Sequence, residues 1–575
     1  MCRIAWLFLM PLALAAQIGG GIYAAPPAAP ANSAPPTKPE DLCTVEGQVS
    51  NAVTGEPVKK ASLLLIRADA AAGTRSGGQR YTATSDAGGR FAIQGVEPGQ
   101  YRFLANRSGF LNTEYGATGP GRQGTLLSLE RGRKVADVVF RLTPNGVITG
   151  RILDEDGDPL ENVQVQLLRF RYNQGKKQLM PAAAGTSNDV GEYRISGIAA
   201  GKYYLNAASR GVEVITLISG GAATYQLSAE QYVPTFYPGT TEVATAVQID
   251  VPAGTQVRGI DLRLAKAPTV RIKGRVVNNT GTARQNLNVM LVPRDSISIS
   301  STHHETAGQD GNFELSGVAP GSYLLVATVN ASGKSYSARQ PLEVANSNVE
   351  GVTVAVGPGV TLSGRLRLDG DAAAGFGSVM VRLAPRDSGP YFGNLPNVKV
   401  NQDGTFKADD VNADRYGVQV GGLPDGFYVK AMRSGNVDVM AAGLDLSSGT
   451  PGPLDIVVRP NAPQVAGTVQ NSNTQQPAPR ATVVLIPQEP ERREQQSYYR
   501  TATADASGHF SLRNVPPGDY QAYAWEEVEY GAWMDPDFLK PVEGKGEGLT
   551  LREGDQRTMQ LVLIPAEAAP GGAGR

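Results

Sequence analysis

Residues 86–101 read DAGGRFAIQGVEPGQY, and the same pattern returns four more times along a chain of 575 residues. It begins with Asp and Gly, which supply the backbone conformation of a tight hairpin turn. An aromatic residue then starts a strand, and a tyrosine follows it by ten positions, as Phe91 and Tyr101 do in the first copy. Because this spacing is constant while the loops elsewhere vary in length, we predict that the block is a rigid structural element.

The five copies share the aromatic residue and the tyrosine, and four of them have a glycine two positions before the tyrosine. The residues that we assign to this structural repeat are Phe91, Gly99, Tyr101, Tyr193, Gly201, Tyr203, Phe313, Gly321, Tyr323, Phe406, Tyr416, Phe510, Gly518 and Tyr520. A Pro-Gly pair suits the central positions of a type II turn, in which the glycine takes a positive φ. The fourth copy has Asp414 in place of this glycine, which predicts a different turn there.

Alternating strands surround each copy of the block. One with a central glycine comes before it, as in residues 44–49, and another ends the repeat, as in residues 138–142. Alternation of apolar and polar residues is typical of strands that bury one face, and no segment has the pattern of a long amphipathic helix. The sequence therefore predicts an all-β chain of five tandem antiparallel β-sandwich domains, of the Ig or transthyretin-like kind.

The expected division of the chain follows these repeats. We predict a signal peptide over residues 1–24, a Pro- and Ala-rich linker over 25–42, sandwiches over 43–143, 144–266, 267–357, 358–461 and 462–566, and a disordered tail over 567–575. The start is typical of a secretory signal, because Arg3 precedes a short apolar run and small residues up to Ala24. Short links between the sandwiches predict a curved or elongated chain of limited flexibility.

Cysteine content and net charge limit the disulfides, ligands and cellular locations that are expected for the chain. Removal of the signal takes away Cys2, so Cys43 is left without an internal disulfide partner and is expected as a half-buried thiol. The formal net charge is −1 without a basic stripe, which argues against binding to nucleic acid. We expect an exported protein that is periplasmic, associated with the outer surface or secreted, with no membrane span after signal cleavage.

At the repeated block the sequence resembles the carboxypeptidase regulatory-like domain, a transthyretin-like sandwich that is often grouped with carbohydrate-binding-like folds. The resemblance rests on Gly-x-Val, Thr-Gly-Glu-Pro-Val-x-x-Ala, Asp-x-x-Gly-x-Phe and Val-x-Pro-Gly-x-Tyr, and it is clearest in the first, third and fifth repeats. It implies that the modules accompany peptidases or transport receptors, or repeat in envelope proteins. The pattern is specific for a fold and weak for a function.

Little in the sequence points to catalysis, to a metal or to a cofactor. The family's peptidases use a His-x-x-Glu zinc motif, but the positions three after His303 and His304 are Thr306 and Ala307. We expect the histidine pair in an exposed loop, and His509 at a structural turn. An acidic cluster of Asp154, Asp156, Asp158 and Glu161 has oxygen ligands of the kind that Ca²⁺ prefers. A solvated turn is the favoured interpretation of this cluster, and calcium binding stays open.

Two stretches contain more aromatic residues than the repeated fold requires. The fifth repeat has Trp525, Tyr530, Trp533 and Phe538 among carboxylates, and the second repeat has Tyr232, Phe236 and Tyr237 among prolines. Such rings can stack on sugars when exposed, or pack against a domain edge when buried. We list all seven as ligand-binding candidates: Trp525, Tyr530, Trp533, Phe538, Tyr232, Phe236 and Tyr237.

Three functions stay open at this point. The favoured one is a non-catalytic cell-envelope scaffold, or protein-interaction array, whose partner is an envelope protein. An alternative is a carbohydrate-binding protein that uses the aromatic loop residues to bind a polysaccharide. A second alternative is an accessory chain of an extracytoplasmic peptidase or transport system.

Overall fold

The computed structural model describes residues 38–566 except 69–78, 118, 123, 174, 210–213, 220–221, 228–229, 282–286, 295–302, 332–333, 371–374, 387–394, 448 and 450–451. The expected signal peptide, most of the expected linker and the expected tail lie outside the described residues. Within the described part of the chain, no helix has the length and apolar character needed to cross a membrane.

The chain is all-β, and the first repeat shows the plan of the others. Its two sheets have the orders β4-β1-β8 and β3-β2-β5-β6, and β7 also pairs with β5. These strands are β1 (Cys43–Asn51), β2 (Ser62–Arg67), β3 (Arg80–Thr84), β4 (Arg90–Val96), β5 (Gly99–Asn106), β6 (Thr113–Glu114), β7 (Leu127–Leu129) and β8 (Lys134–Leu142). The repeated block of residues 86–101 forms the turn before β4, β4 itself and the crossing to β5 in the other sheet.

The second and third repeats follow the same plan. The second has the sheets β12-β9-β19 and β11-β10-β13-β17, and the third has β25-β22-β28 and β24-β23-β26-β27. The strands of the second repeat are β9 (Gly146–Leu153), β10 (Gln164–Asn173), β11 (Lys176–Thr186), β12 (Glu192–Ile198), β13 (Gly201–Ala208), β17 (Thr235–Phe236), β18 (Ile249–Val251), β19 (Gln256–Val257) and β20 (Leu262–Arg263). Those of the third are β22 (Val270–Asn278), β23 (Leu287–Pro293), β24 (His303–Thr306), β25 (Asn312–Val318), β26 (Gly321–Ala331), β27 (Lys334–Val344) and β28 (Val349–Val356).

The fourth and fifth repeats vary the plan. The fourth has the sheets β32-β29-β37-β34-β35 and β31-β30-β33-β36, whereas the strands of the fifth join into one sheet through pairing of β42 with β44. The fourth repeat contains β29 (Val360–Leu368), β30 (Met380–Pro385), β31 (Asn397–Lys399), β32 (Thr405–Val411), β33 (Arg415–Gly421), β34 (Tyr428–Ser434), β35 (Val437–Asp438), α1 (Val439–Ala442), β36 (Leu444–Asp445) and β37 (Leu454–Arg459). The fifth contains β38 (Gln464–Gln470), β39 (Thr482–Pro487), α2 (Pro490–Arg493), β40 (Arg500–Thr503), β41 (His509–Leu512), β42 (Gly518–Trp525), α3 (Pro536–Leu539), β43 (Glu547–Leu551) and β44 (Gln556–Ile564).

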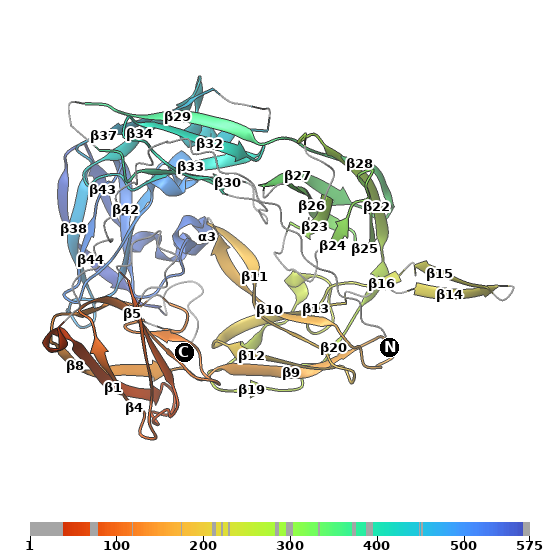
Figure 1. The fold of residues 1–575 in the computed structure, drawn as a ribbon, viewed down its shortest axis with the longest axis horizontal. Coiled ribbons are helices and arrows are strands. Elements are labelled where there is room, and N and C mark those ends of the chain that lie inside the picture. Colours follow the sequence, from red (N-terminus) through yellow and green to blue (C-terminus); the bar gives the residue numbers. More distant parts are fainter. Residues whose placement is uncertain are drawn as a thin grey trace, which may run out of the picture.

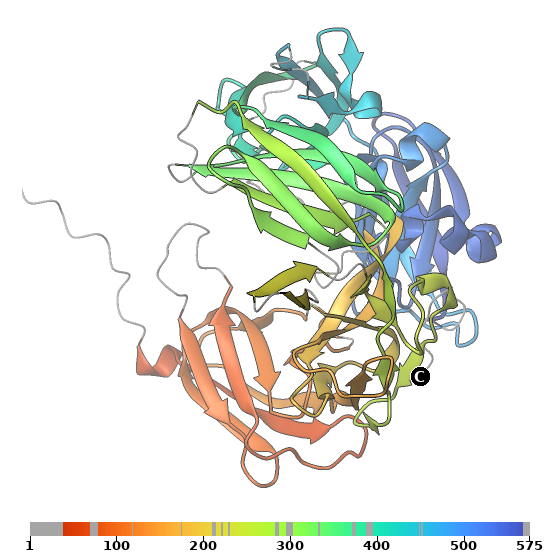
Figure 2. The ribbon, with the colours of Figure 1, turned by 90° about the vertical axis from the view of Figure 1, so that its right-hand side faces the viewer.

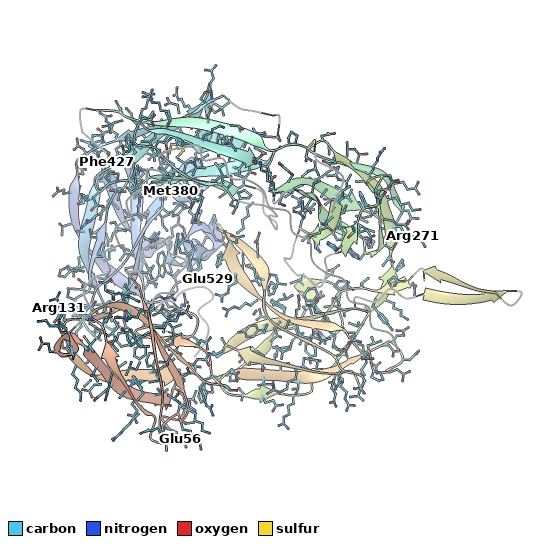
Figure 3. The ribbon with its side chains drawn as sticks, viewed as in Figure 1. Glu56, Arg131, Arg271, Met380, Phe427 and Glu529 are labelled. Carbon is cyan, nitrogen blue, oxygen red and sulfur yellow. The ribbon has the colours of Figure 1, made fainter. Side chains whose placement is uncertain are left out.

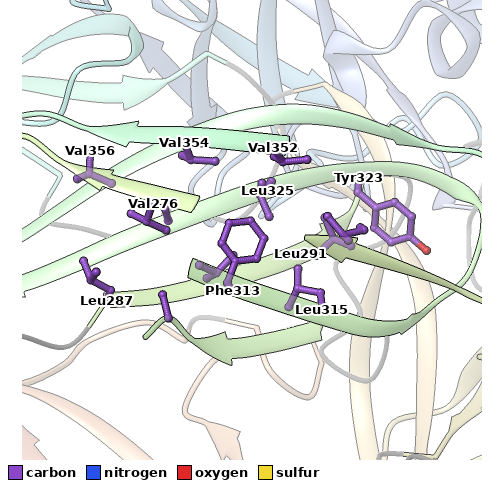
Figure 4. Close-up of a cluster of buried hydrophobic side chains, with 14 of the residues drawn as sticks. Val276, Leu287, Leu291, Phe313, Leu315, Tyr323, Leu325, Val352, Val354 and Val356 are labelled. Carbon is purple, nitrogen blue, oxygen red and sulfur yellow. The ribbon is translucent and has the colours of Figure 1, made fainter. Parts of the chain in front are cut away.

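Each repeat has a hydrophobic core of its own between its sheets. The aromatic residue and the tyrosine of the repeated block lie in that core in all five cases. Figure 4 shows the example in the third repeat, where Phe313, Leu315 and Tyr323 pack against valines of β28. The alternation read from the sequence therefore marks the buried face of each strand correctly.

One feature of the sheets differs from the predicted antiparallel sandwich. The first strand of each repeat pairs antiparallel with the strand of the repeated block, but parallel with a strand near the end of the repeat. The parallel pairs are β1 with β8, β9 with β19 and β20, β22 with β28, β29 with β37, and β38 with β44. Alternation shows which face of a strand is buried, and it carries no information on strand direction.

The central glycine of the first strand is required by a close approach. A Cβ on Gly47 would lie 2.0 Å from the carbonyl oxygen of Val138 and 2.8 Å from the ring of Phe91. The corresponding glycines are also crowded by a backbone oxygen and by the aromatic side chain of their own block: Gly150, Gly274, Gly364 and Gly467. The recurring glycine and the recurring aromatic residue are thus two halves of one packing contact.

The crossing between the two sheets, which we call the corner, has two features in common in all five repeats. The corners are residues 95–101, 197–203, 317–323, 410–416 and 514–520, and each begins with a residue in the left-handed region. Each corner tyrosine donates its hydroxyl hydrogen to the carbonyl oxygen four residues earlier, at 2.8 to 2.9 Å. Every corner is therefore closed by a hydrogen bond from a buried ring.

The predicted type II turn is wrong. In the four repeats that have it, the glycine two positions before the tyrosine has a positive φ, but the values are 150–158°, as for Gly99 at 155°, whereas a type II turn needs about 80°. The residue with left-handed geometry comes four positions earlier, as at Gly95. Asp414 is not among the residues with positive φ, so the expectation of a different turn in the fourth repeat is confirmed.

The repeats follow one another around a ring. Figure 1 shows the fifth repeat returning beside the first and the second, and the side view in Figure 2 shows the same curled course. The hairpin of β10 and β11 extends from the second repeat toward the fifth, next to α3. A second hairpin, of β14 (Val214–Ser219) and β15 (Ala222–Leu227), projects outward instead. The chain is thus curved, as expected, but it is closed rather than elongated.

Candidate functional site

The aromatic stretch of the fifth repeat folds as a compact loop after β42. Gly531 takes a φ of 87° and starts a short 3₁₀ turn over Ala532–Met534. Asp535 then caps α3, because its side chain accepts a hydrogen bond from the backbone N–H of Asp537 at 2.9 Å, and Pro536 occupies the first helical position. These local signals place the aromatic side chains of the loop against one face of the fifth repeat.

Most of the rings in this loop are buried. Trp525 is fully buried, Trp533 and Phe538 are each 4% exposed, and Tyr530 is 64% exposed. The indole of Trp525 stacks on Tyr523 with ring centroids 5.2 Å apart, and Tyr530 contacts Trp533 edge-on at 5.1 Å. The tryptophans therefore belong to a second hydrophobic cluster in the fifth repeat, separate from its sandwich core.

The hairpin of β10 and β11 packs on this cluster. The ring of Tyr172 lies edge-on to Phe538, with centroids 6.0 Å apart. Gly175, between the two strands, approaches Met534 so closely that a Cβ would lie 2.6 Å from the Met534 Cβ. Absence of a side chain at position 175 is thus what lets the hairpin reach the loop.

Glu529 anchors the same hairpin by hydrogen bonds. Its Oε1 accepts from the backbone N–H of Tyr172 at 3.3 Å and from Nη1 of Arg171 at 3.4 Å. Figure 3 places Glu529 at the end of the hairpin, inside the ring of repeats. Burial, with nearby carboxylates, raises the pKa of Tyr172 to about 12, so its hydroxyl stays neutral at physiological pH.

Two further repeats contact this loop. Arg122 of the first repeat pairs with Glu527 at 2.8 Å. Gln419 of the fourth repeat donates to Gln496, which in turn donates to the hydroxyl of Tyr530 at 2.8 Å. The aromatic loop of the fifth repeat is therefore a meeting point for the first, second and fourth repeats, which we call the hub.

The other aromatic candidates lie inside the second repeat or at its junction with the third. Phe236 is buried with Leu168 and Leu179, and Tyr237 packs against the sandwich core. The Tyr232 hydroxyl donates to Glu155 at 3.0 Å, and the Lys266 ammonium lies 4.8 Å from the centre of the Tyr232 ring. In this arrangement the three side chains contribute packing, a hydrogen bond and a cation–π contact.

The possible metal ligands do not converge. Asp154 uses one carboxylate oxygen to accept from the backbone N–H groups of Asp156 and Asp158, at 3.0 and 2.7 Å, which stabilises a turn. Across the residues that the structure describes, no group of three or more His, Cys, Asp or Glu side chains is placed to hold a metal ion.

The histidine pair and the lone cysteine differ from expectation in their surroundings. His303 and His304 lie in strand β24 and not in a loop, because β24 pairs with β23. Burial lowers the pKa of His303, which keeps its ring neutral. Cys43 is fully buried rather than half-buried, and its thiol donates to the carbonyl oxygen of Glu130 at 2.9 Å.

A second set of functional contacts lies at the corners, and the fourth corner shows it best. Asp414 forms an ion pair with Arg339 of β27 at 2.6 Å, and the two side chains are only 15% and 5% exposed. Asn412 accepts from the backbone N–H of Ser337 and donates to its hydroxyl at 3.0 Å. The residue that breaks the glycine pattern thus binds the preceding repeat.

The fifth corner also contacts the repeat that comes before it, and the second corner does so through Asn145. Asn514 of the fifth corner accepts from the backbone N–H of Gly426 at 2.8 Å and donates to a neighbouring carbonyl of the fourth repeat. Gly197 of the second corner donates to the amide oxygen of Asn145, whose amide nitrogen donates to Gly109 of the first repeat. Sequence reasoning missed these contacts, and the only signal for them was the departure at Asp414.

Comparison with known proteins now assigns part of the chain. Residues 44–131 and 464–563 match the family described as the carboxypeptidase regulatory-like domain. The first and fifth repeats are thus similar to the carboxypeptidase regulatory-like domain. Each match spans almost a complete sandwich, from the first strand to the last or nearly so, and the resemblance stated from the motifs is therefore confirmed.

Solved structures similar to the chain include two pilin subunits and one other bacterial protein. The minor pilin GBS52 of Streptococcus agalactiae is 14% identical, with 40% of this chain and 97% of that one covered and a TM-score of 0.22. The major pilin subunit BcpA of Bacillus cereus is 13% identical, with 55% and 99% covered and a TM-score of 0.14. The Bacillus anthracis TIE protein is 10% identical, with 92% and 75% covered and a TM-score of 0.14. No curated protein matches the chain.

Proposed function

We propose that this chain is an exported, non-catalytic scaffold of the cell envelope. Its domains are the five sandwiches of residues 43–143, 144–266, 267–357, 358–461 and 462–566. The observation that supports the proposal most is the use of the corners and the hub, because residues that depart from the repeat pattern bind neighbouring repeats. The contacts fix the sandwiches in one order around a ring.

A fixed ring suits presentation of surfaces to a protein partner. Buried pairs such as Arg339 and Asp414 hold neighbouring sandwiches in one orientation, so the loops on the outside of the ring keep constant positions. A partner that contacts several sandwiches at once then binds without first ordering them, which reduces the entropy lost on association. The partner that we propose is an envelope protein.

The carbohydrate-binding alternative has narrower support. Among the four aromatic candidates of the hub only Tyr530 is exposed, and its hydroxyl is already bonded to Gln496. A sugar ring needs an open aromatic face, and the buried Trp525 and Trp533 offer none in the closed ring. The accessory-chain alternative rests on the carboxypeptidase regulatory-like domains alone.

A capture experiment tests the proposal. The purified exported chain is immobilised and exposed to solubilised envelope proteins, and separately mixed with insoluble polysaccharides and peptidoglycan. We expect saturable capture of a specific envelope protein that rebinds after purification, with the same affinity for wild type and Tyr530→Ala. The matched control is Val437→Ala, which removes another exposed apolar side chain, 51% exposed, in the fourth repeat.

Two outcomes contradict the scaffold. Retention on a polysaccharide that is lost in Tyr530→Ala and kept in Val437→Ala favours carbohydrate binding instead. Absence of saturable binding to every envelope fraction removes the support for a protein partner.

A further inference from the structure

The contact that closes the ring joins segments very far apart in sequence. Arg171 and Tyr172 on the hairpin of β10 and β11 meet Glu529, and Tyr172 also meets Phe538. We call the receiving surface, formed by Glu529, Met534 and Phe538, the socket. Between hairpin and socket the chain runs through the whole third and fourth repeats.

We propose that this contact is exchangeable, and that the socket of one molecule also accepts the β10–β11 hairpin of a second copy of the same chain. The exchanged contact would use the same atoms as the closed monomer, in the manner of domain swapping. Two copies would then be joined by hairpin contacts between them in place of the contact within each copy. This goes beyond a scaffold function, because it gives the scaffold a means of self-association.

The ion pairs of the closing contact are more exposed than the pair that joins the third and fourth repeats. The Arg171 and Glu529 side chains are 40% and 29% exposed, and the supporting pair of Arg122 with Glu527 is 41% and 61% exposed. Exposed ion pairs contribute little to stability, whereas Arg339 at the junction of the third and fourth repeats is only 5% exposed. Because the third and fourth repeats are also joined by the chain itself, the hairpin is expected to leave before that junction opens.

The socket is fitted to this hairpin in particular. Glu529 binds a backbone N–H as well as Arg171, and Met534 occupies the space that a side chain at position 175 would fill. A ligand must therefore present a cation, a free backbone N–H, an aromatic ring and a glycine in the order found in residues 171–175. Every copy of the chain carries that segment together with the socket that receives it.

The balance between closure and exchange depends on concentration. Both states contain the same contact, so the local concentration of hairpin around its own socket competes with the concentration of second copies. Closed monomers are expected when the protein is dilute, and exchanged dimers when it is concentrated or crowded at a surface.

Charge reversal gives a sharp test. In Arg171→Glu the hairpin and its own socket are both acidic, and in Glu529→Arg both are basic, so each variant alone opposes its own closure. When the two variants are mixed, each hairpin meets an opposite charge only in the other molecule. We expect a heterodimer at twice the mass of one chain by native mass spectrometry and light scattering, and at least tenfold less dimer in either variant alone.

The matched control is the double variant Arg171→Glu with Glu529→Arg, which restores opposite charges within one chain. It is expected to be monomeric when dilute and as compact as wild type in small-angle scattering. A mixture that stays monomeric while the double variant closes would overturn the proposal.

Wild-type protein provides a second measurement that does not depend on any variant. Two wild-type preparations, one labelled with ¹⁵N, are mixed at rising concentration and then diluted. Mixed-mass dimers that increase with the concentration of mixing support exchange, and their absence up to the solubility limit contradicts it.

Discussion

Replacing Asp414 with the glycine found at this position in the other four repeats should destabilise the protein. The substitution removes the carboxylate that pairs with Arg339 at 2.6 Å, while the guanidinium stays 5% exposed at the junction of two repeats. Breaking a buried ion pair by removing one partner costs roughly 3–5 kcal/mol. Because Asn412 and Ser337 still hold the junction, we expect about 3 kcal/mol, the lower end.

Differential scanning calorimetry of the full chain measures this effect. The third and fourth repeats together are near the size at which 1 kcal/mol shifts a Tm by roughly 2–4 °C, so their transition should fall by about 6–12 °C in Asp414→Gly. The control is Lys334→Ala on the same strand, which removes a pair whose side chains are 55% and 40% exposed. That loss should stay within about 1 kcal/mol.

The reasoning is refuted if Asp414→Gly unfolds at the wild-type temperature or above it. Such a result would mean that glycine at this corner stabilises the folded state by at least as much as the loss of the ion pair destabilises it. A double variant with Arg339→Leu separates the effect of glycine at the corner from the cost of an unpaired charge. An apolar side chain in place of the guanidinium removes the buried unpaired charge.

Three further predictions concern the repeated block. Tyr520→Phe removes the hydrogen bond of the fifth corner and should cost about 1 kcal/mol in urea unfolding, and an unchanged midpoint would contradict a role for the hydroxyl. Gly467→Ala places a Cβ 1.9 Å from the Met559 carbonyl oxygen and should cost roughly 1–3 kcal/mol or more, whereas Gly544→Ala, with no atom within 4 Å, should be neutral in the same assay. Burial raises the pKa of Tyr323 to about 12 from an unfolded value near 10, so its contribution is complete below pH 10 and is lost as the pH rises through 12. Circular dichroism should show that Tyr323→Phe reduces the alkaline sensitivity of the third repeat, and an identical alkaline midpoint would argue against the tyrosine as its source.

The repeats could be predicted from the sequence because their determinants are local. Alternation marks the buried face of each strand, and the ten-residue spacing from Phe91 to Tyr101 reflects one strand and one crossing of fixed length. The parallel partner of the first strand could not be predicted in this way, because about 90 residues separate β1 from β8 and no periodicity links them.

The aromatic stretch of the fifth repeat stands out in the sequence, but the sequence leaves open whether its rings are exposed to a ligand or packed against a domain edge. Trp525 and Trp533 are buried because the loop after β42 folds back over the outer face of β39 and β42, and the hairpin of the second repeat adds to the cover. Amino-acid composition cannot distinguish aromatic side chains that are buried under a loop from aromatic side chains that are exposed to solvent. The contact of Tyr172 with Glu529 spans more than 350 positions, and only the closed course of the chain brings the two together.

The corner contacts have a consequence for how such a chain can evolve. Tandem sandwiches with one sequence pattern look interchangeable, as if a gene could shuffle, duplicate or delete them freely. Here Asp414 matches Arg339 of the repeat before it, and Asn514 matches the backbone around Gly426. A sandwich moved to another position would keep its fold but lose the corner contacts with the repeat before it. Selection on this protein should therefore act on the order of its sandwiches as well as on their number.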